Sequence, residues 1–281
     1  MLVTVPFTVG DRLNAVLAER SRSVELAGIS LAWAIWALVA IAASLALPGG
    51  LTLLRLAAPT MAAAAVVVTA SAPVTVWGSL GVASAVLIAA ISMLGAIADH
   101  CVNGSAYGDE RRFALRLPVG FVVGPVPAAW AVLAGGLVGG VLAVAARSWF
   151  LGAALLATSG LAGWRFVPAF HALSSRWLVM VPAGITLVDH LTLAEPTLFA
   201  RNDLRSVGPA LSDTDAIDLS GHALGTPIEL RLDRPTEIIR RISAQEAEAT
   251  LVSAILISPA SPAAVLRELD VRSGGVFPSV P

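Results

Sequence analysis

The chain has 281 residues, of which 57% are hydrophobic and 13% are charged, with a formal net charge of −1. Soluble domains carry about 45–50% apolar and about 25% charged residues, so this composition excludes an ordinary soluble protein. The near-neutral balance gives no field that would attract nucleic acid. All 18 basic residues are arginines, and Cys101 is the one cysteine. This excludes lysine chemistry, an intramolecular disulfide and a cysteine-rich metal site.

Residues 1–24 allow two interpretations. Val9, Leu13, Val16 and Leu17 follow helical spacing, which favours a short helix in the membrane interface. The alternative is a solvated N-terminal tail, because three arginines and two acidic residues also lie in this stretch.

A transmembrane bundle is predicted over residues 25–167, where charges are sparse. About 20 apolar residues cross a bilayer core. We expect about five transmembrane helices, at 26–47, 52–71, 74–98, 127–146 and 149–165. Arg55 interrupts the second of these, and we expect its side chain to reach the membrane interface. The remaining spans hold no ionisable residue at mid-membrane, which argues against proton-coupled transport.

A polar segment, residues 99–118, separates the third and fourth spans. Arg111, Arg112 and Arg116 make it the most basic of the short loops, so we expect a loop at the membrane interface. Asp99-His100-Cys101 suggests a cysteine nucleophile with a histidine base. Adjacent side chains point apart in a helix or a strand, which favours a polar helix end instead.

The fourth span contains four glycines in two overlapping GxxxG pairs, namely Gly135, Gly136, Gly139 and Gly140. Glycine at this spacing lets a second helix approach closely, either within the chain or in a dimer. Pro125 and Pro127 precede the pairs. They indicate either the start of the helix or a broken helix at a substrate site.

Arginine counts predict the orientation. Five crossings put the two termini on opposite sides of the membrane, and positive charge favours the cytoplasm. A cytoplasmic tail places six arginines inside (Arg55, Arg111, Arg112, Arg116, Arg165, Arg176) against four outside (Arg12, Arg20, Arg22, Arg147). We therefore expect a multi-pass protein of the inner (plasma) membrane with a cytoplasmic C-terminal domain.

Residues 168–273 are predicted to form a small, mostly β, α+β domain, followed by a flexible tail at 274–281. Six or seven short strand-like runs, beginning with a hairpin around Pro182-Ala183-Gly184, precede a closing helix predicted from Ser258-Pro259 to Val271.

Polar clusters in this tail have plain structural interpretations. Asp189-His190, with His171, lacks the further ligands that a metal site needs. Asp213, Asp215 and Asp218 with His222 lack the glycine and distal glutamate of an EF-hand. Arg240-Arg241 would face opposite sides of a strand, so only one can join a lipid-binding patch. We predict no catalytic, cofactor-binding or metal-binding residues.

Three segments resemble bacterial pleckstrin-homology-like domains appended to membrane helices: RWLVMVPAGITLVD, TLFARNDLRSVG and ILISPASPAAVLREL. With NGSAYGDERR and SSRWLVMVPAG, the whole chain resembles uncharacterised integral membrane proteins of actinobacteria. The resemblance implies protein–protein or assembly contacts and no catalytic residues. The basic phosphoinositide pocket of eukaryotic relatives has no counterpart here.

The predicted function is therefore a scaffold or assembly component, not an enzyme, held in the lipid bilayer and bound to a partner protein or to further copies of itself. A transporter or channel component is the first alternative, and a membrane-bound enzyme is the second.

Overall fold

The computed structural model describes the whole chain except residues 72, 74, 212, 244 and 274–281. It divides into two compact units. Unit 1 contains Met1–Ile97 and Pro125–His171, and unit 2 contains Ala98–Gly124 and the described residues from Ala172 onward. The chain passes between the units three times, because residues 98–124 lie between helices of unit 1 but belong to unit 2.

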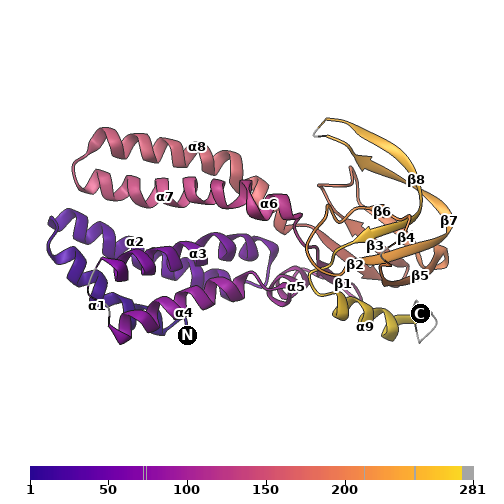
Figure 1. Cartoon of the computed structure of the whole chain (residues 1–281), viewed down its shortest axis with the longest axis horizontal. Coiled ribbons are helices and arrows are strands. Elements are labelled where there is room, and N and C mark those ends of the chain that lie inside the picture. The colour runs from indigo at the N-terminus through magenta and orange to yellow at the C-terminus, as the bar shows by residue number, and fades with distance from the viewer. Residues whose placement is uncertain (72, 74, 212, 244, 274–281) are drawn as a thin grey trace. The chain divides into compact units, whose positions relative to one another are not determined.

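Long apolar helices make up unit 1 (Figure 1). They are α1 (Thr4–Ala18), α2 (Arg22–Ser44), α3 (Pro48–Ala70), α4 (Val76–Ser92), α7 (Pro125–Ala145) and α8 (Trp149–Ser174), the last ending in unit 2. Helices α5 (Gly95–Asn103) and α6 (Val119–Val123) lie at the borders of the inserted segment. By length and composition, four helices of the described chain can cross a membrane, or five if α4 and α5 form one bent span. The structure thus agrees with the predicted multi-pass helical protein.

The helix boundaries differ from all five predicted spans. Helices α2 and α3 begin earlier than predicted, at Arg22 rather than 26 and at Pro48 rather than 52, and they end at Ser44 and Ala70. Our third span ends at residue 98, whereas α4 ends at Ser92 and α5 continues to Asn103 after a 58° bend; its predicted start, residue 74, lies outside the described residues. The fourth helix begins at Pro125, because proline suits the first turn of a helix. The fifth continues past 165 to Ser174, with Pro168 inside it. Loss of hydropathy at Arg165 ends the apolar stretch, but it does not end the helix.

Helix α1 is neither a solvated tail nor a helix free on the interface. It packs along the bundle, with Val5 and Leu17 buried. The Trp36 indole N–H donates to the Leu2 carbonyl oxygen at 3.0 Å. Gly81 of α4 lies directly against Thr8 and Val9, where a side chain would collide. Small residues on α4 therefore let α1 join the bundle, and hydrophobic spacing in α1 alone does not reveal this.

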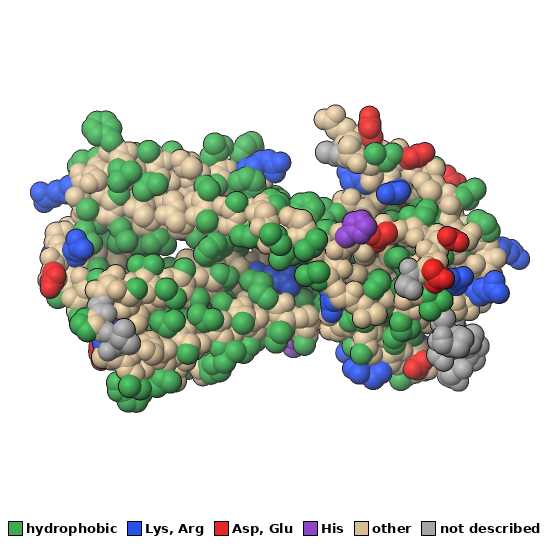
Figure 2. Space-filling view, in the orientation of Figure 1, with side chains coloured by type: hydrophobic (Ala, Val, Ile, Leu, Met, Phe, Trp, Pro, Cys, Tyr) green, Lys and Arg blue, Asp and Glu red, His purple; other side chains and the backbone are tan. Residues whose placement is uncertain are grey.

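Small residues dominate the interior of unit 1. Alanines from α2, α3 and α4 are almost fully buried, including Ala42, Ala58 and Ala85. Large apolar side chains such as Trp33, Phe150 and Trp164 are exposed on the outside. Figure 2 shows hydrophobic side chains covering much of the helical surface on the face in view, while charged side chains gather over the strands and at helix ends. Small residues inside and bulky ones outside are typical of helices that pack in lipid.

Two antiparallel four-stranded sheets form unit 2. The strands are β1 (Arg111–Ala114), β2 (Trp177–Val181), β3 (Gly184–Val188), β4 (Thr197–Ala200), β5 (Leu204–Pro209), β6 (Ile217–Asp218), β7 (Ile228–Arg241) and β8 (Ala247–Ile257). The sheet orders are β1-β2-β3-β4 and β5-β7-β8-β6, with only the short β6 parallel to its neighbour β8. A 3₁₀ turn, Arg201–Asp203, precedes β5, and helix α9 (Pro262–Ser273) closes the unit.

The predicted domain boundary at residue 168 needs correction. Strand β1 comes from the segment between two membrane helices, yet it pairs along its whole length with β2, from Arg111 opposite Met180 to Ala114 opposite Trp177. Phe113 and Leu115 also enter the core of the domain. The domain therefore consists of residues 98–124 together with the tail. A four-residue strand is too short to be recognised without its partner. The predicted flexible segment 274–281 lies outside the described residues.

The core of unit 2 lies between the two sheets and under α9. Leu178, Met180 and Leu187 come from the first sheet, and Leu230 and Ile255 from the second. Val265 and Leu269 bring one face of α9 into the same cluster. The predicted hairpin is present, since Val181 pairs with Gly184 across a two-residue turn. The predicted combination of strands with one closing helix is confirmed.

Candidate functional site

The three arginines predicted to form an interfacial loop do not share a surface. Arg112 donates to the Ser105 hydroxyl oxygen at 2.8 Å and to the Glu110 carboxylate at 2.5 Å. Arg116 donates to the carbonyl oxygens of Leu224 and Ala260. Arg111 alone is exposed. Two of the three guanidinium groups therefore make hydrogen bonds within unit 2.

Asp99, His100 and Cys101 diverge on helix α5. The Asp99 carboxylate accepts a hydrogen bond from the Ala114 main-chain N–H at 2.8 Å. Cys101 is buried, and His100 is exposed. One turn after Asp99, the Asn103 side chain donates to the Arg112 carbonyl oxygen at 2.7 Å and accepts from the Arg112 N–H at 2.9 Å. The polar residues of α5 therefore cap the outer edge of β1, which is a structural role.

Arg176 and Asp189 form a buried ion pair that the sequence analysis did not find. Both side chains are 1% exposed, and two N–H groups of Arg176 donate to the two carboxylate oxygens at 2.6 and 2.8 Å. The Leu191 N–H and the Thr192 hydroxyl donate to the same carboxylate. A third Arg176 nitrogen donates to the Arg116 carbonyl oxygen at 3.0 Å, which connects the pair to the inserted segment.

The environment of Asp189 favours its charged form. Burial by itself raises the pKa of this carboxyl, but the hydrogen bonds and charge of Arg176, with those from Leu191 and Thr192, lower the pKa below its ordinary value. A buried pair of this kind is stable only when nearly every polar atom has a partner, as here. The pair therefore holds the start of β2 and the end of β3 together.

The remaining candidate ligands do not converge. Asp218 accepts from the Ser220 and His222 N–H groups, as a turn-capping residue does. The Thr52 hydroxyl oxygen of unit 1 lies 3.3 Å from His171 Nδ1. Within the described part of the chain, no group of three or more His, Cys, Asp or Glu side chains could hold a metal ion.

The glycine pairs of α7 differ in their surroundings. A Cβ added at Gly136 would lie 3.0 Å from Ser159 Cβ of α8, tighter than an ordinary contact, and one at Gly140 would collide with Leu156. An added Cβ at Gly135 would meet nothing within 4 Å, and one at Gly139 would make only ordinary contact with Leu155. The Ser159 hydroxyl also donates to the Leu133 carbonyl oxygen at 2.8 Å. Gly136 and Gly140 therefore serve close packing of α7 on α8 within the chain.

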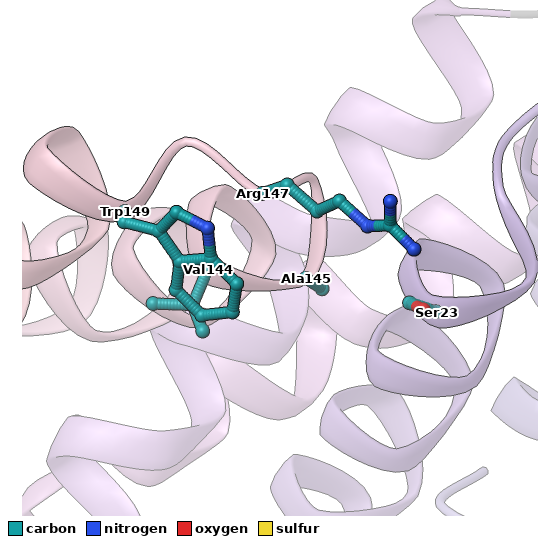
Figure 3. A pocket seen from close by; sticks show the side chains of 5 residues that line it. All are labelled: Ser23, Val144, Ala145, Arg147 and Trp149. Carbon is teal, nitrogen blue, oxygen red and sulfur yellow. The ribbon is translucent and has the colours of Figure 1, made fainter.

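Among the hollows of the described structure, two are considered as candidate sites. One, in unit 1, has a volume of about 610 Å³ and is lined by Ser23, Val144, Ala145, Arg147 and Trp149 (Figure 3). The other, in unit 2, has a volume of about 230 Å³ and lies beside the β2–β3 turn and α9, with Arg201 and Arg272 on its rim. In this second hollow, Arg272 is already bound to Glu268 and to the Asp109 carbonyl oxygen.

An open strand edge is the clearest candidate interaction surface. The β7–β8 hairpin extends beyond the other strands of unit 2 (Figure 1). Residues 192–194 cover the free side of β7 there, through hydrogen bonds with Ile239 and Arg241. Among the described residues, β8 pairs only with β7 from residue 247 to residue 252, because β6 reaches only Ile255 and Leu256. We call residues 247–253 the β8 edge.

The side chains of the β8 edge are mostly exposed, and Leu251 is 69% exposed. Only Val252 is buried within it. An edge strand presents main-chain N–H and C=O groups to which an extended peptide can pair. The sequence pattern predicts strand-like runs in this tail, but it does not show that one side of a particular strand stays open.

Comparison of the chain with models of protein families, with curated proteins and with solved structures finds no match.

Proposed function

We propose that this protein is a membrane-anchored assembly component, and that the β8 edge binds an extended segment of a protein partner. The proposal rests on one observation, a difference between the two sides of the β7–β8 hairpin. Residues 192–194 pair with β7, whereas the β8 edge has no such neighbour in the described chain. Main-chain pairing would supply affinity, and exposed side chains such as Leu251 would supply selectivity.

The proposal includes a pleckstrin-homology-like identity for unit 2 and a cytoplasmic location. Two packed antiparallel sheets closed by one C-terminal helix support the first, together with the resemblance of the three tail segments. The excess of arginines on the same side as the tail supports the second. Asp99, Arg116 and Asp189 use their charged groups in hydrogen bonds or ion pairs within the fold. These structural roles support binding over catalysis.

Site-specific photocrosslinking tests the proposal in the cells that make the protein. A photoreactive phenylalanine analogue replaces Leu251 in the β8 edge, or Leu224 as a control; the two are 69% and 70% exposed. We expect a discrete crosslinked protein from position 251 and none from 224. A second substitution in the edge, Ala249→Lys, should abolish that product, because charge on an edge strand blocks pairing. Equal products from 251 and 224, or a product that survives Ala249→Lys, would refute the proposal.

The mass of the crosslinked product identifies the occupant. A product of twice the chain's mass would mean that a second copy pairs along the edge, and any other discrete mass would mean a separate partner. Both belong to the proposed assembly role.

A further inference from the structure

The turn between α7 and α8 has an arginine where glycine is usual. The Ser148 N–H donates to the Ala143 carbonyl oxygen, and the Arg147 N–H donates to the Val144 carbonyl oxygen, both at 2.9 Å. This pair of bonds is the Schellman ending of a helix, whose left-handed residue is most often glycine. Arg147 occupies that position with a φ of 63°. Glycine at this position would avoid the backbone strain, so the presence of arginine suggests that its side chain has a function.

The side chain of Arg147 reaches over the hollow of unit 1. Figure 3 shows it extended from the turn toward Ser23, near the beginning of α2. Within the described chain, the guanidinium of Arg147 makes no hydrogen bond or ion pair with another residue. At the beginning of α2, Arg22 and Glu25 form an ion pair with each other at 3.0 Å, and Ser23 is the α2 residue that lines the hollow. The polar part of the hollow therefore offers hydrogen-bond donors and positive charge.

The rest of the hollow is apolar and lies at the end of two membrane helices. Val144, Ala145 and Trp149 line it. Trp149 is 63% exposed and the adjacent Phe150 is 95% exposed, as expected of aromatic residues at the boundary between lipid and water. A short turn between two spans lies at the depth of the lipid headgroups. A volume of about 610 Å³ is within the range of small-molecule sites.

We propose that this hollow binds the headgroup of an anionic phospholipid, with the guanidinium of Arg147 on the phosphate. A guanidinium matches the geometry of a phosphate with two parallel hydrogen bonds. The Ser23 hydroxyl adds a second donor, and Trp149 with Val144 contacts the glycerol and the first methylenes. An anionic headgroup is favoured over choline, because a trimethylammonium group would bring positive charge next to Arg147. The inference is independent of the β8 edge and of unit 2.

Lipid retention by the full-length protein tests the proposal. Protein is purified in detergent, exchanged into mixed phosphatidylglycerol and phosphatidylcholine, and examined by native mass spectrometry for bound lipid. Arg147→Gly removes the guanidinium and relieves the left-handed strain, so the variant should fold at least as well as the wild type. Arg165→Gln is the matched control, an exposed arginine on the following helix, α8, many residues along the helix from the hollow.

We expect the wild type and Arg165→Gln to retain phosphatidylglycerol equally, and Arg147→Gly to retain it about tenfold less well, the effect of losing one charged hydrogen-bonding group. Equal retention by all three proteins would overturn the proposal. A parallel arm measures the thermal shift given by inorganic phosphate without lipid. If phosphate stabilises the wild type as much as phosphatidylglycerol does, and Arg147→Gly abolishes both shifts, the ligand is the free anion and the lipid assignment is wrong.

Discussion

The Asn103 side chain and the Arg112 main chain exchange two hydrogen bonds, at 2.7 and 2.9 Å. Asn103 thus takes the place that a neighbouring strand would take beside β1. A segment that looks like a loop between two membrane helices thereby becomes an integral part of a folded domain.

Replacing Asn103 by alanine should weaken this attachment. Two main-chain groups of Arg112 would lose their partners, and a partly buried polar group left unpaired costs about 1–3 kcal/mol. We expect faster hydrogen exchange in β1 and β2 and a lower midpoint of thermal unfolding. His100→Ala, an exposed change on the same helix, is the control and should leave both quantities unchanged. Equal exchange in the two variants would contradict this role of Asn103.

Substitutions of Arg176 and Asp189 should have strongly non-additive effects on the free energy of unfolding. Either Arg176→Met or Asp189→Leu leaves one charge buried without its partner, and breaking a buried ion pair in this way costs about 3–5 kcal/mol. The double variant should recover much of that loss, because neither charge remains. Denaturant unfolding of the four proteins gives the coupling energy. Additive losses in the double variant would show that the two charges do not depend on one another.

The same pair predicts how stability varies with pH. The pKa of Asp189 is lowered in the folded protein, whereas an unfolded aspartate has a pKa of about 3.9. As the pH falls below that value, the unfolded chain binds the proton first, so the stabilisation by Asp189 is complete above it. This stabilisation is lost as the pH falls through the folded pKa. Asp189→Asn should be less stable at neutral pH, and its deficit should shrink in acid. A deficit that stays constant from pH 7 to pH 3 would refute the assignment.

Neighbouring glycines of α7 should respond differently to the same substitution. Gly136→Leu would collide with Ser159 and with the Leu155 carbonyl oxygen, and overpacking of a tight contact costs about 1–3 kcal/mol. Gly135→Leu adds a side chain where nothing lies within 4 Å, so it should be close to neutral. Thermal unfolding in detergent compares the two. A larger loss from Gly135→Leu, together with a change in oligomeric state, would instead indicate a helix contact between chains.

The amino-acid sequence predicts the parts of this structure that depend on local pattern. Uncharged apolar stretches predict the membrane helices. Two strand-like runs on either side of Pro182-Ala183-Gly184 predict the β2–β3 hairpin. The ion pair was within reach of the same reasoning. A two-residue turn that pairs Val181 with Gly184 also pairs Trp177 with Val188, which places Arg176 opposite Asp189. The sequence alone instead favours a simple strand end at Asp189-His190.

Other features depend on contacts between distant segments, which pattern does not encode. Strand β1 is four residues long and becomes a strand only by pairing with β2, more than sixty positions later in the sequence. Helix α1 joins the bundle because Gly81 of α4 leaves room for it. The open β8 edge is defined by which neighbours are absent from one side of a strand in the described chain, and no local pattern carries that information.

The central claim is that residues 98–124 and the tail form one domain on one side of the membrane. Cysteine labelling tests it directly. In a Cys101→Ala background, single cysteines replace Tyr107, Leu224 or Ser148; Tyr107 is 90% exposed and Leu224 is 70% exposed. A membrane-impermeant maleimide is applied to intact cells and, separately, to permeabilised cells. We predict that positions 107 and 224 label under the same condition and that position 148, one crossing away, labels under the other. Labelling of 107 and 224 from opposite sides would contradict the account.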